Sequence, residues 1–146
     1  MSLPAATKAG GQALATPDTC HIPAPPPPAG PGGIPTPFPN TAMLSDTDKA
    51  TKNVLMSNKG VVVEDSEVPR TMGDEAGVSN LPTPKGLMSQ KNMGKAVFKT
   101  YSSKVKAEGK GVVTHTATTA HNGSGNMNMP AGTHMAPSQA KILVGS

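Results

Sequence analysis

The chain is poor in the side chains that usually build a large core. Its 146 residues include no tryptophan, one tyrosine, two phenylalanines and a single cysteine. One cysteine excludes an internal disulfide, and few aromatic side chains leave little apolar surface to bury. Sixteen glycines and 16 prolines add a bias toward irregular backbone. Such a composition is typical either of disorder or of a small domain stabilised by a metal ion or a partner.

The sequence also lacks long apolar runs. No segment approaches the roughly 20 apolar residues of a membrane-spanning helix. The first 20 residues lack the apolar centre of a signal peptide. We therefore expect assembly in the cytoplasm, no export by the general secretory route and no stable membrane insertion.

A modest positive charge does not by itself indicate nucleic-acid binding. The formal net charge is +4, and lysines are frequent in residues 91–110. Nucleic-acid-binding surfaces usually combine clustered positive charge with several aromatic stacking platforms. Only Phe98 and Tyr101 lie among these lysines, so we expect a solvated strand face and no nucleic-acid partner.

Alternation of apolar and polar residues predicts strands in three segments. Residues 50–64 read as a hairpin with a turn at "SNKG", and residues 95–114 alternate on both sides of "EGKG". Residues 138–145 predict a further short strand. No segment shows sustained helical periodicity. The sequence therefore predicts a mainly β fold of short strands and long loops.

Other segments carry no such pattern. Residues 1–16 are small and polar, and we expect a flexible N-terminal arm before a domain that spans residues 17–146. Four consecutive prolines, Pro25 to Pro28, favour polyproline II geometry, so residues 17–40 should wrap the surface as a strap rather than enter a central strand. Residues 115–137 show no strand pattern and are expected to form loops.

One thiol and three imidazoles form a candidate metal site. Zinc is commonly held by four cysteine and histidine ligands. His21 directly follows the cysteine, so in an extended chain its side chain points to the other face, although the sequence leaves open whether it replaces one of the other histidines. The zinc ligands expected from the sequence are Cys20, His115, His121 and His134.

The same residues allow an enzymatic alternative. A thiol with a histidine partner can act as a nucleophile, so a small thiol-dependent or metal-dependent enzyme or toxin using Cys20 is the second interpretation. A substrate pocket is hard to build from so few apolar and aromatic side chains. We therefore expect a protein that is not an enzyme.

Several blocks resemble a known family in the same order. They are "PDTCHIPAPPPPAGPGGIPTPFPN" near the N-terminus, "GDEAG" at residues 73–77, "GKAVF" at residues 94–98 and "AEGKGVVTHTATTAHN" at residues 107–122. Together they resemble the PAAR-like proteins over roughly residues 15–123. Within this resemblance, Cys20, His115 and His121 fall on the motif positions, and His134 is added to complete four ligands.

The resemblance implies a structural role. PAAR-like proteins form a small β-rich cone, pinned by zinc at its tip, that caps the trimeric spike of bacterial contractile injection systems, chiefly type VI secretion. It implies one copy of this chain on each VgrG-type spike trimer, a non-covalent effector or adaptor as a further partner, and export by the injection apparatus into a target cell or the medium.

A cap on a trimer needs three similar contact surfaces. The alternating segments, residues 51–64, 95–114 and 138–145, are the candidates for these surfaces. On this interpretation the metal ligands lie at the opposite, pointed end. Charged substitutions at Val62 or Leu143 are expected to abolish docking without affecting the metal.

Overall fold

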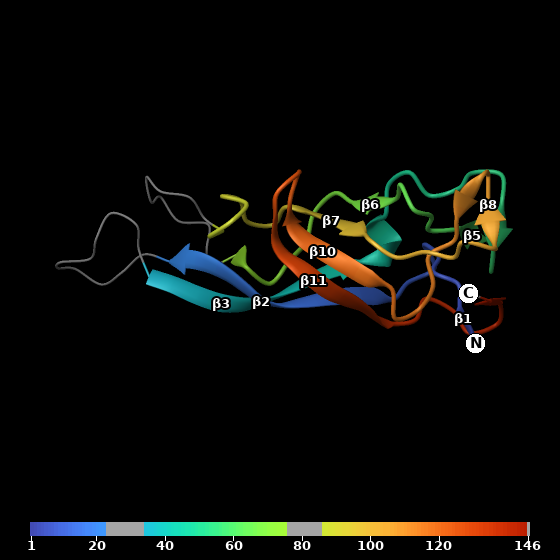
Figure 1. Ribbon diagram of the computed structural model, residues 1–146, viewed down its shortest axis with the longest axis horizontal. Coiled ribbons are helices and arrows are strands. Elements are labelled where there is room, and N and C mark those ends of the chain that lie inside the picture. The colour runs from blue at the N-terminus through green and yellow to red at the C-terminus, as the bar shows by residue number, and fades with distance from the viewer. Residues whose placement is uncertain (23–33, 76–85, 146) are drawn as a thin grey trace.

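The molecule is elongated and built almost entirely from antiparallel strands, as the computed structural model shows (Figure 1). The structure describes residues 1–22, 34–75 and 86–145. Within these ranges the helical content is one 3₁₀ turn, η1 (Leu44–Asp46), and no helix is long and apolar enough to cross a membrane. The prediction of a mainly β fold is confirmed.

A six-stranded antiparallel sheet forms the body of the molecule. Its spatial order is β3-β2-β11-β10-β7-β6. Strands β2 and β3 run side by side along the long axis of the molecule (Figure 1). The strands of this sheet are β2 (Gln12–Ile22), β3 (Ile34–Met43), β6 (Glu67–Val68), β7 (Lys95–Phe98), β10 (Thr118–Gly123) and β11 (Met127–Ala136).

Three two-stranded ladders gather at one end of the molecule, on the right in Figure 1. Two are hairpins closed by tight turns, and the third is formed by the two chain ends. We call these ladders the three base ladders. They are β4 (Leu55–Met56) with β5 (Lys59–Gly60), β8 (Lys106–Ala107) with β9 (Lys110–Gly111), and β1 (Ser2–Pro4) with β12 (Leu143–Gly145).

The two hairpins repeat each other residue by residue. Thr51 and Ser102 each donate a backbone N–H to the residue that follows the second strand, at 3.0 and 2.8 Å. Gly60 and Gly111 lie close to the backbone carbonyl groups of Thr51 and Ser102. A Cβ at Gly60 would stand 2.5 Å from the oxygen of Thr51, and one at Gly111 would stand 2.5 Å from the oxygen of Ser102. The close approach of the backbone therefore requires glycine at both positions.

The segments that follow the base ladders are joined in a closed ring of backbone hydrogen bonds. The N–H of Ala6 donates to Val113, that of Val113 donates to Val62, and that of Val62 donates back to Ala6, at 2.8 to 3.0 Å. The same rotation relates three more bonds and three bridges. The bonds are Lys8 to Gly60, Glu64 to Gly111 and His115 to Pro4, and the bridges are Ala5–Thr114, Thr7–Val61 and Val63–Val112. One chain thus builds a pseudo-three-fold end.

This ring separates two small apolar clusters. Ala6, Val62 and Val113 face a cluster that extends toward the sheet and includes Leu44 and Phe98. The neighbouring ring residues face a second cluster between the base ladders. That cluster contains Ala5, Val61, Val63, Ala107, Val112 and Val144. Each segment of the ring therefore contributes alternate side chains to two cores, as strand geometry dictates.

The structure corrects two expectations about individual segments. The segment 115–137, expected to be loop, supplies the central strands β10 and β11. The expected flexible arm, residues 1–16, instead packs into the domain, with Ala5 and Ala6 fully buried. Its separation from a domain at 17–146 stays a prediction. Pro25 to Pro28 lie outside the described residues.

The remaining prolines of the expected strap lie in an edge strand. Thr41 of β3 exchanges backbone hydrogen bonds with Met72 on the outer side of the sheet. Pro35, Pro37 and Pro39 lie six, four and two residues before Thr41 on β3, so their backbone nitrogens face the same outer side as that of Thr41. At these three positions proline replaces the outward N–H groups. Proline cannot donate a ladder hydrogen bond, and this edge therefore does not offer a template for another strand.

Candidate functional site

The cysteine is enclosed by polar side chains rather than by histidines. Cys20 lies in β2 and is fully buried. Its Sγ lies 3.9 Å from Oδ1 of Asp18 and 3.8 Å from Oδ2 of Asp74. Asp18 is two residues earlier on the same strand, so both side chains point to the same face of the sheet. Asp74 comes from the segment that follows the Thr41–Met72 bridge.

Three asparagine side chains converge on Asp18 from neighbouring strands. Asn40 of β3 donates to Oδ2 at 2.9 Å, and Asn122 of β10 donates to both oxygens at 3.1 and 3.2 Å. Asn128 of β11 also donates to Oδ1. Because hydrogen bonds to a charged acceptor are stronger than neutral ones, a single carboxylate connects four strands of the sheet. We call Asp18 and these three asparagines the Asp18 network.

The environment of Cys20 opposes formation of a thiolate. Burial, followed by the charges of Asp18 and Asp74, raises the pKa of Cys20 to about 12. Burial and the neighbouring Asp18 carboxyl also raise the pKa of Asp74 to about 6, although the N–H of Met93 donates to both of its oxygens. A thiol with such a pKa stays protonated near neutrality, so it is a poor nucleophile without a cation beside it.

The same group can hold a metal ion. One ligand atom from each of Asp18, Cys20 and Asp74 lies within 4.8 Å of the others, and all three residues are buried. Two buried carboxyl groups close together are costly to ionise without a counter-charge, and a divalent cation would offset that cost. We call these three residues the Asp–Cys–Asp group.

His121 lies next to this group but is hydrogen-bonded elsewhere. Its Nδ1 is 2.8 Å from Oδ1 of Asn40, and its Nε2 is 2.9 Å from Oγ1 of Thr119. Burial lowers the pKa of His121 to about 4. The imidazole is neutral and both of its nitrogens are hydrogen-bonded. It holds Asn40 in place for the bond from Asn40 to Asp18, so His121 supports the Asp18 network through Asn40.

The other two histidines of the expected ligand set, His115 and His134, lie far from the cysteine. His134 pairs with Ala13 on β2, and Cys20 lies seven residues further along that strand, roughly 20 Å at about 3.3 Å per residue. The rings of His134 and His115 meet edge to face with centroids 5.4 Å apart. His134 is fully buried, and its ring nitrogens face the carbonyl oxygens of Thr114 and Ala136 at 3.2 and 3.0 Å. The four expected zinc ligands thus lie in three separate environments.

The sequence carried a signal for part of the Asp–Cys–Asp group. A carboxylate two residues before the cysteine in an extended segment shares its face, and the spacing Asp18-x-Cys20 is visible in the printed sequence. Asp74 is 54 residues away from Cys20 and belongs to no regular element, so spacing could not connect them.

Comparison with known proteins identifies a family. The model of the toxin PAAR-like domain matches residues 11–131. The DNase toxin Tse7 of Pseudomonas aeruginosa is 38% identical over 116 residues, which is 78% of this chain and 29% of that protein. The chain therefore spans less than a third of the length of this relative. No solved structure matches the chain.

These comparisons overturn one expectation. We predicted a protein that is not an enzyme, and the similarity to a protein named as a DNase toxin contradicts that prediction. The prediction rested on the lack of a pocket-forming apolar core in this chain, and the matched region covers only 29% of that relative. The thiol-enzyme alternative gains nothing from this match, because Cys20 is buried and its pKa is about 12.

Proposed function

Since this chain belongs to the toxin PAAR-like domain family, we propose that it caps the trimeric spike of a contractile injection system and delivers a toxin of the DNase class. The observation that carries the proposal is the closed ring through Ala6, Val62 and Val113. A monomeric cap can match a three-fold partner only if its own chain repeats one arrangement three times around an axis. The ring and the three base ladders do this.

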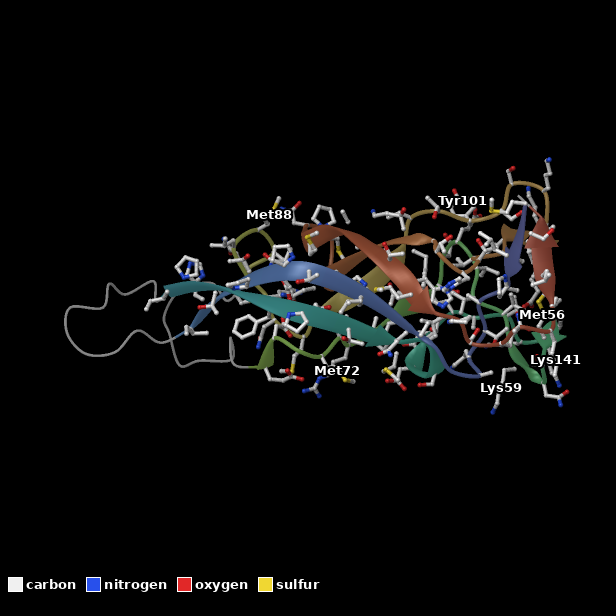
Figure 2. All side chains as sticks on the ribbon, turned by 90° about the horizontal axis from the view of Figure 1, so that it is seen from below. Met56, Lys59, Met72, Met88, Tyr101 and Lys141 are labelled. Atoms are coloured by element: carbon white, nitrogen blue, oxygen red, sulfur yellow. The ribbon has the colours of Figure 1, made fainter. Side chains whose placement is uncertain are left out.

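The location of the ladders supports docking through one end. All three lie at the same end of the long axis, and Met56, Lys59 and Lys141 mark that end in Figure 2. Cys20 lies near the C-terminal end of β2, which points away from the base ladders (Figure 1). The cap would therefore meet a VgrG-type trimer with its base ladders and lead with the end that contains the Asp–Cys–Asp group.

The remaining parts of the proposal follow from the mode of delivery. The complex would assemble in the cytoplasm and leave with the injection apparatus. The toxin would be continuous with this domain or bound to it without a covalent link, together with any adaptor. The domain's task would be rigidity and attachment, and the antiparallel sheet linked through the Asp18 network suits it to that task.

Stoichiometry tests the capping proposal directly. We expect the purified chain to form a complex with its cognate spike trimer in the ratio of one chain to three spike subunits, because the three base ladders occupy all three equivalent faces. Native mass spectrometry of the complex gives this ratio. Three chains on each trimer, or no complex at all, would overturn the proposal.

A structural zinc ion forms a second part of the proposal. We propose that it binds at the Asp–Cys–Asp group rather than at His115 and His134. Thiolate and carboxylate are both zinc ligands, so these residues would supply three of the four positions of the ion, and the thiol would lose its proton on binding. The ion would cross-link β2 to the segment at Asp74.

Metal analysis separates this assignment from the histidine set. Protein prepared without chelators is expected to contain about one zinc ion per chain, the content of a single site. Asp74→Ala should remove the zinc, because it removes one ligand of a buried group, whereas His134→Ala should retain it. Elemental analysis by mass spectrometry measures both. Zinc that persists in Asp74→Ala and disappears in His134→Ala would contradict the assignment.

A further inference from the structure

The three base ladders are equivalent in position but differ in one exposed side chain. Each ladder contains a residue that pairs with the position two residues before a ring residue. These pairs are Leu55 with Gly60, Lys106 with Gly111 and Leu143 with Pro4. We call Leu55, Lys106 and Leu143 the ladder-start positions. The pseudo-three-fold arrangement places them at matching sites around the axis.

The two leucines are unusually exposed for apolar side chains. Leu55 is 56% exposed and Leu143 is 55% exposed, although their chain neighbours Met56 and Val144 belong to or pack against the apolar cluster of the base. Lys106 is exposed as well. The next positions along the ladders, Met56, Ala107 and Val144, contact that cluster instead. The described part of the chain therefore leaves two leucines in solvent at symmetry-related sites.

Neighbouring exposed positions do not follow this pattern. The positions two residues before the ladder starts are also equivalent to one another. They are occupied by polar, exposed residues, namely Asn53, Lys104 and Lys141. Of these two sets of equivalent positions, only the ladder starts carry exposed apolar side chains, and they do so in two of the three ladders. Isolated exposed leucines need no explanation, but a pair at symmetry-related sites indicates that the surface of a partner buries them.

We propose that the ladder starts insert into three identical apolar contact sites of the spike trimer, and that Lys106 is the mismatched member of the three. This inference rests on the proposed function and specifies its interface. A homotrimer must present the same surface three times. Leu55 and Leu143 would each bury their side chains against it, whereas Lys106 must direct its ammonium group back to solvent or lose its hydration.

The consequence is an interface weaker than its geometry allows. Replacing Lys106 by leucine would complete the apolar set without changing the ladder, since the side chain is exposed and leucine already occupies the two equivalent positions. Lys106 would thus set the affinity of the chain for the trimer.

The experiment measures the dissociation constant of the chain and its purified cognate spike trimer. Lys106→Leu is expected to bind about tenfold more tightly, the effect of burying one further leucine side chain. Leu55→Ala and Leu143→Ala are each expected to bind about tenfold more weakly. Lys104→Leu is the matched control, because its equivalents are polar in all ladders, and its affinity should equal that of the unmodified chain. Thermal melting of each variant confirms folding.

The possible outcomes separate the inference from the proposed function. If the unmodified chain does not bind the trimer, the capping function is wrong and this inference is wrong with it. If binding occurs and the leucine variants weaken it, but Lys106→Leu binds no more tightly than the unmodified chain, the inference alone is overturned. Equal tightening by Lys106→Leu and Lys104→Leu would also overturn it, because it would reflect general surface hydrophobicity.

Discussion

Asp18→Ala is expected to lower the free energy of unfolding by about 3 to 5 kcal/mol, the range for breaking a buried charged network. The change removes the acceptor shared by Asn40, Asn122 and Asn128, and leaves these buried amides without that partner. It also removes one donor atom from the Asp–Cys–Asp group. Equilibrium unfolding in urea, followed by circular dichroism, measures the effect.

Asp65→Ala provides the control for this measurement. Asp65 is also paired, its carboxylate lying 3.0 Å from Nζ of Lys110, but its side chain is 61% exposed. Exposed ion pairs contribute about 0 to 1 kcal/mol because water and salt screen them. A loss in Asp18→Ala no larger than that in Asp65→Ala would show that the Asp18 network does not hold the strands together.

Val62→Asp and Leu143→Asp are expected to fail in different ways. Val62 is fully buried, packs in the apolar cluster next to the sheet and carries two bonds of the ring. A carboxylate there has no partner, so we expect the domain to unfold at ordinary temperature. Leu143 is exposed, so Leu143→Asp should fold normally and lose measurable binding to the spike trimer.

The two variants are distinguished by combining melting curves with a binding assay. The sequence alone grouped Val62 with Leu143 as docking residues, because both lie in alternating segments. Burial now separates them, because Val62 is fully buried and Leu143 is exposed, so of the two only Leu143 is accessible to a partner. A folded Val62→Asp protein that merely fails to dock would contradict the structural assignment.

The hairpins were predictable because their local sequence is sufficient to specify them. Ser57–Asn58 and Glu108–Gly109 have positive φ at both positions, as two-residue hairpin turns require. Strong alternation on either side then fixes the ladders. The third ladder was only half visible, because residues 138–145 predicted a strand while its partner near the N-terminus was taken for a flexible arm.

Strands β10 and β11 escaped prediction for a different physical reason. Their buried face is largely polar and includes His121, Asn122, Asn128 and His134. A hydropathy pattern detects apolar burial, and here hydrogen bonds replace apolar contacts. The same feature made His121 and His134, which hydrogen-bond within the sheet, read in the sequence as metal ligands in a loop.

The position of the chain ends has a consequence for engineering. Ser2 pairs with Gly145 at the site that the turn residues Ser57 and Asn58 occupy in the first hairpin. The ends therefore stand where an ordinary two-residue turn would close the third ladder. A circularly permuted chain, joined there by a short glycine linker and opened between Ser57 and Asn58, would keep every strand pairing. Cargo fused to the new ends would then leave the domain one third of a rotation away from its original position.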